Sequence, residues 1–414
     1  MRSLLQAVAI VVLAATVVRA DAILYATAAT TNGVDGFCVR NDGSLAPTPN
    51  THVGTRGKNP RRLVVGGNTL YVAETDRVEV FRIGPHGGLK SVGSTRPLLT
   101  PNKMNPLDVA LSPDLKMLYV PQSGQRRIAA YPLGDDGKFT LTKDSDPFAG
   151  DFSSCIQAPV GPRYRRIAVR DSLLYVTEAA NNGAVAIYPL TADPATGRLE
   201  LQLKPTDCVL GKTPSETTCP LSERRRLFAP NAFILDGDRI YVESLFHHRI
   251  FAFPLTNGLF DPLFPQHKKA PKDTVPVCLM DSDGNTIKGP FRWAPSTSKT
   301  NAAEKYQDLV FQDGTLLASQ FLQGRIDAFQ LKSDGSLPRR PTRTTTGDLR
   351  GSPVGLAVRG NVLYVAAGEL DRVQAFHIGR TNALPEPTPF SETDEQTDSF
   401  PNALAVAELS DSCP

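Results

Sequence analysis

Short runs of alternating apolar and polar residues recur along the chain. Seven of them share a core in which Leu or Ile precedes an anchor residue, most often in the phrase Leu-Tyr-Val. The anchors are Tyr25, Tyr71, Tyr119, Tyr175, Tyr241, Leu317 and Tyr364. A period of two residues, with abundant Val, Ile, Phe and Tyr, is typical of half-buried β-strands, so each run predicts a strand.

Each anchor lies within a unit of four predicted strands. One strand precedes the anchor run, another alternating run follows it, and a Gly or Asn turn leads into a short fourth strand. The first strands of these units are Arg62–Val65, Leu107–Leu111, Arg166–Val169, Ala232–Leu235, Asp308–Phe311, Val354–Val358 and Ala403–Ala407. Seven antiparallel units without a helical pattern between them predict an all-β protein, a seven-bladed β-propeller with four-stranded blades.

The two ends of the chain supply parts of one unit. The first predicted strand, Ile23–Ala26, is the second strand of a unit, whereas Ala403–Ala407 near the C-terminus is a first strand with no successor. Pairing these strands would close the ring and remove its open sheet edges. Cys38 would then end the third strand of this unit and Cys413 would lie just past its innermost strand, and because these two strand ends point the same way, we expect a disulfide between them.

The other four cysteines leave their pairing more open. Cys208 and Cys219 lie in one insertion and are expected to pair locally, which would leave Cys155 to pair with Cys278. The cysteines have no CxxC spacing and the histidines no HxxxH spacing, so no metal site is predicted. Glycine-rich nucleotide-binding motifs are also absent from the sequence, and no cofactor is expected.

The first 20 residues have the features of a signal peptide. Arg2 precedes an apolar stretch that ends near Val18, and Val18-Arg19-Ala20 offers small residues at a cleavage site. This stretch is short for a membrane span, so no membrane anchor is expected. We expect residues 21–414 to form a single domain in a secreted or periplasmic protein, where disulfides persist.

Extra length is concentrated at one kind of connection. The insertions fall between the last strand of one unit and the first strand of the next, at 142–163, 202–229, 261–305 and 385–400. Such connections share one face of a propeller, so the insertions are expected to cover that face. Long loops on a rigid scaffold often bind ligands, although tolerated insertions without a function would look the same in sequence.

Charged residues near the strand ends are the candidate chemistry. Arginine pairs stand at the start of two first strands, glutamates follow three anchor tyrosines, and a histidine pair occupies one hairpin tip. The candidate catalytic residues are Glu178, Glu74 and Arg165, and the candidate ligand-binding residues are Arg62, Arg166, Glu243 and His247. Arginines could bind an anionic molecule while a carboxylate moves a proton, or these groups could be ion pairs between blades.

The overall charge argues against a polyanionic partner. Lys and Arg total 45 against 42 Asp and Glu, a balance that lacks the polybasic signature of nucleic-acid binders.

The repeats resemble those of the YVTN/lactonase-like seven-bladed propellers, which include enzymes of the 6-phosphogluconolactonase and carboxymuconate cyclase types. The resemblance rests on LYVAETDRVEVFRIGPHGGL (Leu70–Leu89), LYVAAGELDRVQAFHI (Leu363–Ile378) and LSPDLKMLYV (Leu111–Val120). It implies that Arg165 and Glu178 match an arginine and a glutamate typical of these enzymes. Arg166 stands where they carry a histidine, and an arginine stays protonated near neutral pH.

Two functions of different classes follow. One is an exported, monomeric scaffold whose loop-bearing face binds a small anionic ligand or a protein partner. The alternative is a lactonase- or cyclase-like enzyme acting on a carboxylated lactone or a sugar-acid lactone. In that enzyme Arg165 and Arg166 would bind carboxylate, and Glu178 or Glu74 would act as acid or base. The sequence leaves open whether the protein is an enzyme.

Overall fold

The computed structural model describes most of the chain beyond the predicted signal peptide. The described residues are 22–47, 49–95, 105–123, 127–140, 164–178, 183–202, 205–211, 230–244, 249–261, 274–281, 292–295, 297, 306–344, 352–379, 389–394, 400–411 and 413. The predicted signal peptide, the insertion 142–163, Cys155, Cys219 and His247 lie outside these residues.

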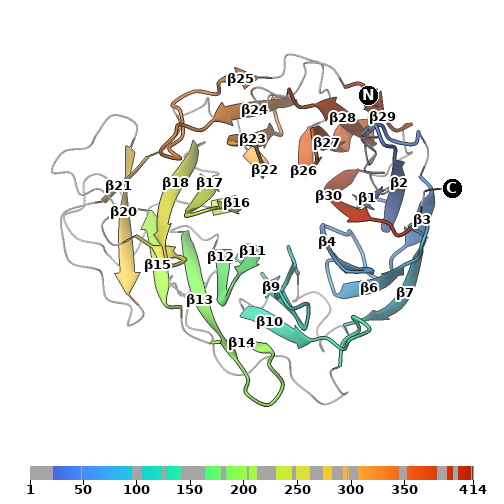
Figure 1. The fold of residues 1–414 in the computed structure, drawn as a ribbon, viewed down its shortest axis with the longest axis horizontal. Helices are drawn as coiled ribbons and strands as arrows, with labels where there is room; N and C mark the ends of the chain where they lie inside the picture. The colour runs from blue at the N-terminus through green and yellow to red at the C-terminus, as the bar shows by residue number, and fades with distance from the viewer. Residues whose placement is uncertain are drawn as a thin grey trace, which may run out of the picture.

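Seven sheets surround a central axis, which confirms the predicted seven-bladed propeller (Figure 1). The innermost strands are β4 (Arg62–Gly66), β8 (Ala110–Leu111), β11 (Tyr164–Arg170), β16 (Pro230–Asp236), β22 (Tyr306–Gln312), β26 (Pro353–Arg359) and β30 (Pro401–Glu408). The second strands are β5 (Thr69–Ala73), β9 (Met117–Gln122), β12 (Leu173–Glu178), β17 (Arg239–Ser244), β23 (Thr315–Gln320), β27 (Val362–Ala367) and β1 (Ala22–Ala28). The third strands are β6 (Val78–Ile83), β10 (Arg127–Pro132), β13 (Ala184–Ala192), β18 (Arg249–Thr256), β24 (Arg325–Gln330), β28 (Arg372–His377) and β2 (Gly33–Val39).

The outermost strands are shorter and less regular. They are β7 (Leu89–Ser94), β14 (Leu199–Leu201), β19 (Leu259–Phe260), β25 (Arg343–Thr344), β29 (Ser391–Glu392) and β3 (Thr51–Gly54). In the β8–β10 blade, a single bridge between Leu133 and Phe139 takes this place among the described residues. A 3₁₀ turn, η2 (Gly368–Leu370), links β27 to β28.

Two outermost strands begin later than the sequence pattern predicts. They were expected directly after the turns at Gly43 and Gly335, but β3 and β25 start at residues 51 and 343, and only an isolated bridge between Leu45 and Val39 follows the first of these turns. In both cases two prolines follow the turn, and the strand begins two residues after the second of them, Pro49 or Pro341. Proline lacks the N–H that a ladder needs, so a continuous strand forms only beyond it. The strand predicted after Asn382 lies outside the described residues.

The ring closes as predicted. Strand β1 pairs antiparallel with β30, with Ile23 opposite Ala407, and β2 and β3 complete the blade. Cys38 and Cys413 form a disulfide with a Cα–Cα distance of 5.9 Å, which confirms that prediction. A disulfide between residues so far apart in sequence fits an extracytoplasmic protein, since reducing compartments rarely preserve such bonds.

Two insertions extend one blade outward, an arrangement that the expectation of face-covering loops did not include. Strand β15 (Asp207–Gly211) pairs with β13, and β20 (Thr274–Asp281) and β21 (Arg292–Pro295) follow it at the rim (Figure 1). Edge strands readily accept further strands because their backbone groups are unpaired. The register places Cys208 opposite Met280 and Cys278 opposite Leu210, while the predicted partners Cys219 and Cys155 lie outside the described residues.

The anchor tyrosines explain why the Leu-Tyr-Val phrase repeats. Each of the six tyrosine hydroxyls crosses to the next blade and donates a hydrogen bond to a backbone carbonyl there. In five cases the acceptor lies in the turn after the third strand, and for Tyr119 it is Leu199, the first residue of β14. The five bonds run from Tyr25 to Gly87 (2.7 Å), Tyr71 to Gly137 (2.7 Å), Tyr175 to Gly258 (2.6 Å), Tyr241 to Gly335 (2.9 Å) and Tyr364 to Gly43 (3.0 Å). These five acceptor glycines all have positive φ, which only glycine adopts freely. The repeat therefore encodes contacts between blades.

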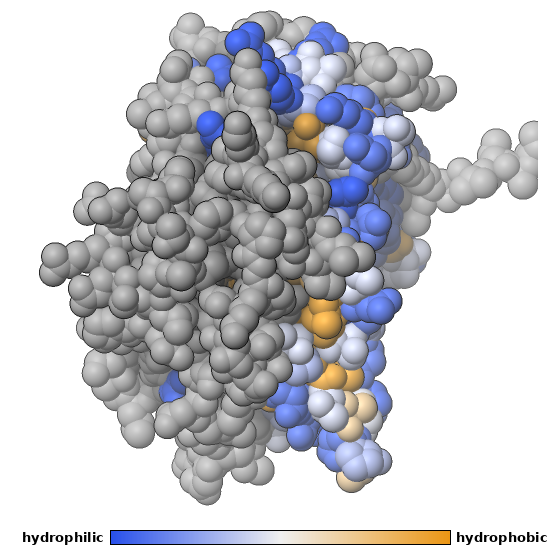
Figure 2. Space-filling view, turned by 90° about the vertical axis from the view of Figure 1, so that its left-hand side faces the viewer, coloured by the Kyte–Doolittle hydropathy of each residue, from blue (hydrophilic) through white to orange (hydrophobic). Residues whose placement is uncertain are grey.

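The described surface is mostly polar. On the side shown in Figure 2, hydrophilic residues dominate the coloured surface, and apolar residues occur singly or in small groups. Among the residues whose burial is described, the large apolar side chains that stand exposed are Leu115 and Leu322. The described part of the chain contains no helix that is long and apolar enough to cross a membrane.

Candidate functional site

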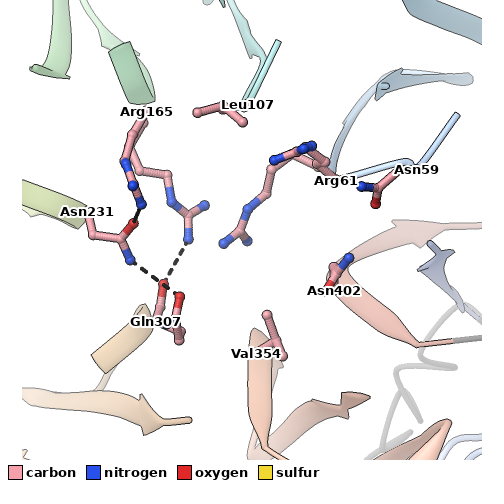
Figure 3. Close-up of a pocket in the computed structure, with 10 residues that line it drawn as sticks. Asn59, Arg61, Leu107, Arg165, Asn231, Gln307, Val354 and Asn402 are labelled. Carbon is pink, nitrogen blue, oxygen red and sulfur yellow. Dashed lines mark hydrogen bonds between the residues drawn. The ribbon is translucent and has the colours of Figure 1, made fainter. Parts of the chain in front are cut away.

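The seven innermost strands start in the same way, and this shared start builds the candidate site. A Pro or Tyr comes first, a variable residue second, and an apolar residue that enters the core stands fourth. We call the seven second residues the mouth ring. They are Arg61, Leu107, Arg165, Asn231, Gln307, Val354 and Asn402. All seven line one cavity on the propeller axis, so every blade contributes one side chain to it (Figure 3).

β-Bulges place these side chains. The pairing register shifts at the start of β11, β16, β22 and β26, between the first strand position and the third or fourth. A bulge re-aims side chains and leaves backbone N–H groups without a ladder partner. Hydroxyls of the second strands accept these groups: Thr177 from Arg166 N–H at 2.9 Å, and Ser319 from Asp308 N–H at 3.0 Å.

The cavity has a volume of about 230 Å³ and a strongly basic lining. Besides the mouth ring, its lining residues are Asn59, Arg62 and Arg166. Among the described residues, the lining thus combines four guanidinium groups, four side-chain amides and two apolar residues, with no carboxylate. An environment of this kind favours a small anion that also carries hydrogen-bonding groups.

The amides hold part of the mouth ring in place. Arg165 donates to the side-chain oxygen of Asn231 at 2.7 Å, and Asn231 in turn contacts the Gln307 side chain at 3.5 Å. Arg166 donates to the Gln307 backbone carbonyl at 3.3 Å (Figure 3). These bonds join three blades along one side of the cavity.

An ion cluster forms the next layer of the channel. Asp308 of β22 accepts from Arg62 at 3.1 Å and from Arg166 at 2.6 Å, so it links blades on different sides of the axis. Asp108 lies 3.9 Å from Arg166 and accepts from the Ile167 N–H at 3.1 Å. The positive charges of the two arginines balance the negative charges of the two aspartates in this layer, and the layer is largely buried.

The pKa directions follow from this burial and pairing. Burial alone would raise the pKa of Asp308, but the guanidiniums of Arg166 and Arg62 outweigh it and hold that pKa below its ordinary value. Burial raises the pKa of Asp108 despite the same two arginines. Burial lowers the pKa of Arg62, and it also lowers that of Arg61, although both remain cationic near neutral pH. The lining therefore stays positively charged.

Glu178 does not lie with Arg165 in the cavity. It is fully buried at the end of β12, opposite Tyr164, and its carboxylate accepts from the Tyr188 hydroxyl at 3.2 Å. Arg165 emerges from the bulge that follows Tyr164 and reaches the mouth instead.

The other candidate glutamates also lie outside the lining. Glu243 is buried on β17 behind Asn231, where burial raises its pKa well above the ordinary value against the opposing effect of Arg165. Glu74 is buried after β5, and burial, followed by repulsion from Glu79, raises its pKa to about 8. Four of the predicted residues, Arg62, Arg165, Arg166 and Glu243, thus lie at or beside the mouth.

Several residues of the site were not predicted from the sequence. They are Asp108, Asn231, Asp308, Gln307 and Asn402. Aligning the seven strand starts by their leading Pro or Tyr would have found them. In this alignment the second position gives the mouth ring, and the third position gives the residues of the ion cluster. Within the described residues, no three His, Cys, Asp or Glu side chains gather in an arrangement that could hold a metal ion.

The fold and the site together define a seven-bladed propeller with a basic pocket at its centre. Comparison with known proteins places this structure beside 6-phosphogluconolactonase-like propellers. No family model matches the chain, and no curated protein sequence is significantly similar to it.

Three solved structures show the likeness. A putative 6-phosphogluconolactonase from Bacteroides fragilis has a TM-score of 0.64 and 14% identity, covering 95% of this chain and 99% of that one. A putative 6-phosphogluconolactonase from Bacteroides uniformis has a TM-score of 0.63 and 15% identity, covering 94% and 100%. A periplasmic gluconolactonase from Pseudomonas aeruginosa has a TM-score of 0.63 and 16% identity, covering 94% and 99%. At these identities the likeness establishes the fold.

Proposed function

We propose that this protein is an exported propeller that binds a small anionic molecule in its central mouth. The observation that carries the proposal is the cavity lining, in which four arginines meet and the described residues contribute no carboxylate. Asp308 and Asp108 offset Arg62 and Arg166 in the layer below. Arg61 and Arg165 add further guanidinium donors to the lining, Arg165 with the buried Glu243 beside it, and these are the donors that a ligand would engage.

The lining also suggests the class of ligand. A guanidinium presents a planar pair of donors that matches a carboxylate or a phosphate. The amides of Asn59, Asn231, Gln307 and Asn402 can donate to and accept from hydroxyl groups. A volume of about 230 Å³ lies below the 300–1,000 Å³ typical of ligand pockets, so the occupant would be small. A hydroxylated acid or its phosphate ester has this combination of groups.

Lactone hydrolysis is a second candidate, because the similar structures from Bacteroides and Pseudomonas are described as lactonases. Hydrolysis requires a group that takes a proton from water near the lactone carbonyl. Asp308 and Asp108 are engaged by arginines, and Glu178 accepts from Tyr188. Glu243, buried beside Arg165, is the carboxyl whose raised pKa best suits an acid or base role.

Calorimetric titration with gluconate, 6-phosphogluconate and neutral glucose would test the binding function. We expect both anions to bind and glucose not to bind, with affinity falling as salt rises. Arg61→Gln and Arg165→Gln should each weaken binding at least tenfold, which corresponds to about 1.4 kcal/mol. Arg343→Gln, at an exposed outer strand, is the matched control and should bind normally. Equal affinity for glucose and gluconate would refute anion recognition.

Turnover of gluconolactone and its 6-phosphate by the same variants separates the two functions. Hydrolysis that is lost in Glu243→Gln while gluconate binding persists would establish the enzyme. Binding without turnover would establish the binding protein.

The protein's setting completes the proposal. We infer secretion or delivery to the periplasm from the N-terminal sequence together with the disulfide. A small ligand is favoured over a protein partner because the described site is concave and central. We expect a monomer, which light scattering would check.

A further inference from the structure

The polar residues of the mouth form two groups on opposite sides of the propeller axis. The blades follow one another around the axis in chain order, so the two apolar members of the mouth ring, Leu107 and Val354, divide it into two polar arcs. The first arc consists of Arg165, Asn231 and Gln307, and the second arc of Asn402, Arg61 and the neighbouring Asn59. The middle of one arc lies half a turn from the middle of the other, so the arcs face each other across the cavity (Figure 3).

The two arcs have the same composition. Each arc combines one guanidinium group with two side-chain amides. A guanidinium matches a carboxylate with two parallel donors, and an amide can both donate to and accept from a hydroxyl group. Each arc therefore suits the same chemical unit, a carboxylate with a neighbouring hydroxyl.

The first arc is ordered by its own hydrogen bonds. Asn231 accepts from Arg165 at 2.7 Å and contacts the Gln307 side chain at 3.5 Å, so the direction of the guanidinium is set before a ligand arrives. A side chain that is already held in place loses less freedom when it binds. This arc is therefore prepared to receive one end of a ligand.

The second arc contains a buried donor without a partner. Arg61 Nε is buried and makes no hydrogen bond, and within the described part of the chain no carboxylate pairs with the Arg61 guanidinium. A buried donor that no group satisfies is costly unless a ligand or water bonds to it. The adjacent Asn59 adopts a left-handed backbone with a φ of 50°, and its N–H donates to the Asn32 side chain at 2.7 Å, which fixes this residue at the cavity. The second arc thus calls for its own anionic partner.

We propose that the mouth recognises a hydroxylated dicarboxylic acid, with one carboxylate and its neighbouring hydroxyl at each arc. The inference rests on the proposed binding function and narrows its class of ligand. Leu107 and Val354 would flank the carbon chain between the two ends. The terminal carboxyl carbons of an extended six-carbon chain lie about 6 Å apart, a span that a cavity of about 230 Å³ can hold. Aldaric acids such as glucarate have this pattern of groups.

Calorimetric titration of the wild-type protein with glucarate, gluconate and adipate at equal ionic strength tests the proposal. Glucarate has a hydroxylated acid at both ends and gluconate at one end, whereas adipate has two carboxylates and no hydroxyls. We expect glucarate to bind about tenfold more tightly than either of the others, because it alone supplies partners for every group of both arcs.

Arg61→Gln and Arg165→Gln each remove the guanidinium of one arc. Each substitution should weaken glucarate binding more than gluconate binding, so that the preference for glucarate falls to within about twofold. Arg343→Gln, at an exposed outer strand, is the matched control and should keep the preference of the wild type.

The outcomes separate this inference from the proposed function. Gluconate that binds as tightly as glucarate would overturn the two-ended ligand and leave the anion-binding function in place, whereas a protein that binds neither acid would overturn both. Adipate that binds as tightly as glucarate would overturn the role of the amides. A preference for glucarate that survives in both arginine variants would overturn the assignment of one carboxylate to each arc.

Discussion

Replacing Asp308 by asparagine removes the charge at the centre of the channel while keeping the shape of the side chain. Asp308 is largely buried. Its carboxylate accepts hydrogen bonds from the Arg62 and Arg166 guanidiniums and from the Leu356 N–H, the last at 3.0 Å. The substitution leaves two guanidinium groups without their shared carboxylate, and one remaining amide oxygen cannot serve three donors equally.

The structure sets the size of the effect. Removing one partner of a buried ion pair costs about 3–5 kcal/mol, because the other charge stays buried and unpaired. Asp308 engages two arginines, so we expect a loss of unfolding free energy in the upper part of this range. The pKa of Asp308 lies below its ordinary value when folded, so its contribution is present above about pH 4 and is lost as the pH falls through the folded pKa. The acid-sensitive part of the stability should therefore be smaller in the variant.

Urea unfolding followed by circular dichroism measures this change, with the exposed Asp313→Asn as control. The unpaired arginines also predict that sulfate stabilises Asp308→Asn more than the wild type at equal ionic strength. A variant as stable as the wild type, or one that gains nothing from sulfate, would refute the assigned role of the ion cluster.

Three further predictions concern the ring and its buried carboxyl groups. Tyr71→Phe should lower the unfolding free energy by about 1 kcal/mol, since it removes the bond to the Gly137 carbonyl, and thermal unfolding would check this. Cys38→Ser with Cys413→Ser should cost about 2–5 kcal/mol, and reducing agent should destabilise the wild type but not the double variant. The wild type should lose stability as the pH rises from about 5 to 8, because the pKa of Glu74 is raised to about 8 in the folded state. Glu74→Gln should remove that decline, and an unchanged pH profile would contradict the burial argument.

The ring closure is a tertiary feature that the local alternation of apolar and polar residues predicts. Alternation placed Ile23–Ala26 and Ala403–Ala407 in one blade, and the Cys38–Cys413 disulfide lies where that pairing required. The register of a half-buried strand follows from which side chains must face the core, so sequence specifies it strongly.

The candidate site was harder to predict because its contacts join different blades. The sequence predicted that Glu178 and Arg165 act at one site, yet a bulge after Tyr164 directs Arg165 to the mouth and leaves Glu178 with Tyr188. Asp308 offered no signal in its own segment. Its role depends on Arg62 and Arg166, which lie 246 and 142 residues away in sequence.

The sequence by itself determined the number of blades, the strand faces and the closure of the ring, because period-two burial and turn chemistry act over a few residues. Only the tertiary structure decided which charged groups meet on the axis. Seven short strand starts converge there from across the whole chain, and bulges of one or two residues choose which side chain points inward. The electrostatics of the mouth therefore depend on the distances between charged groups of different blades, which a local sequence pattern does not predict.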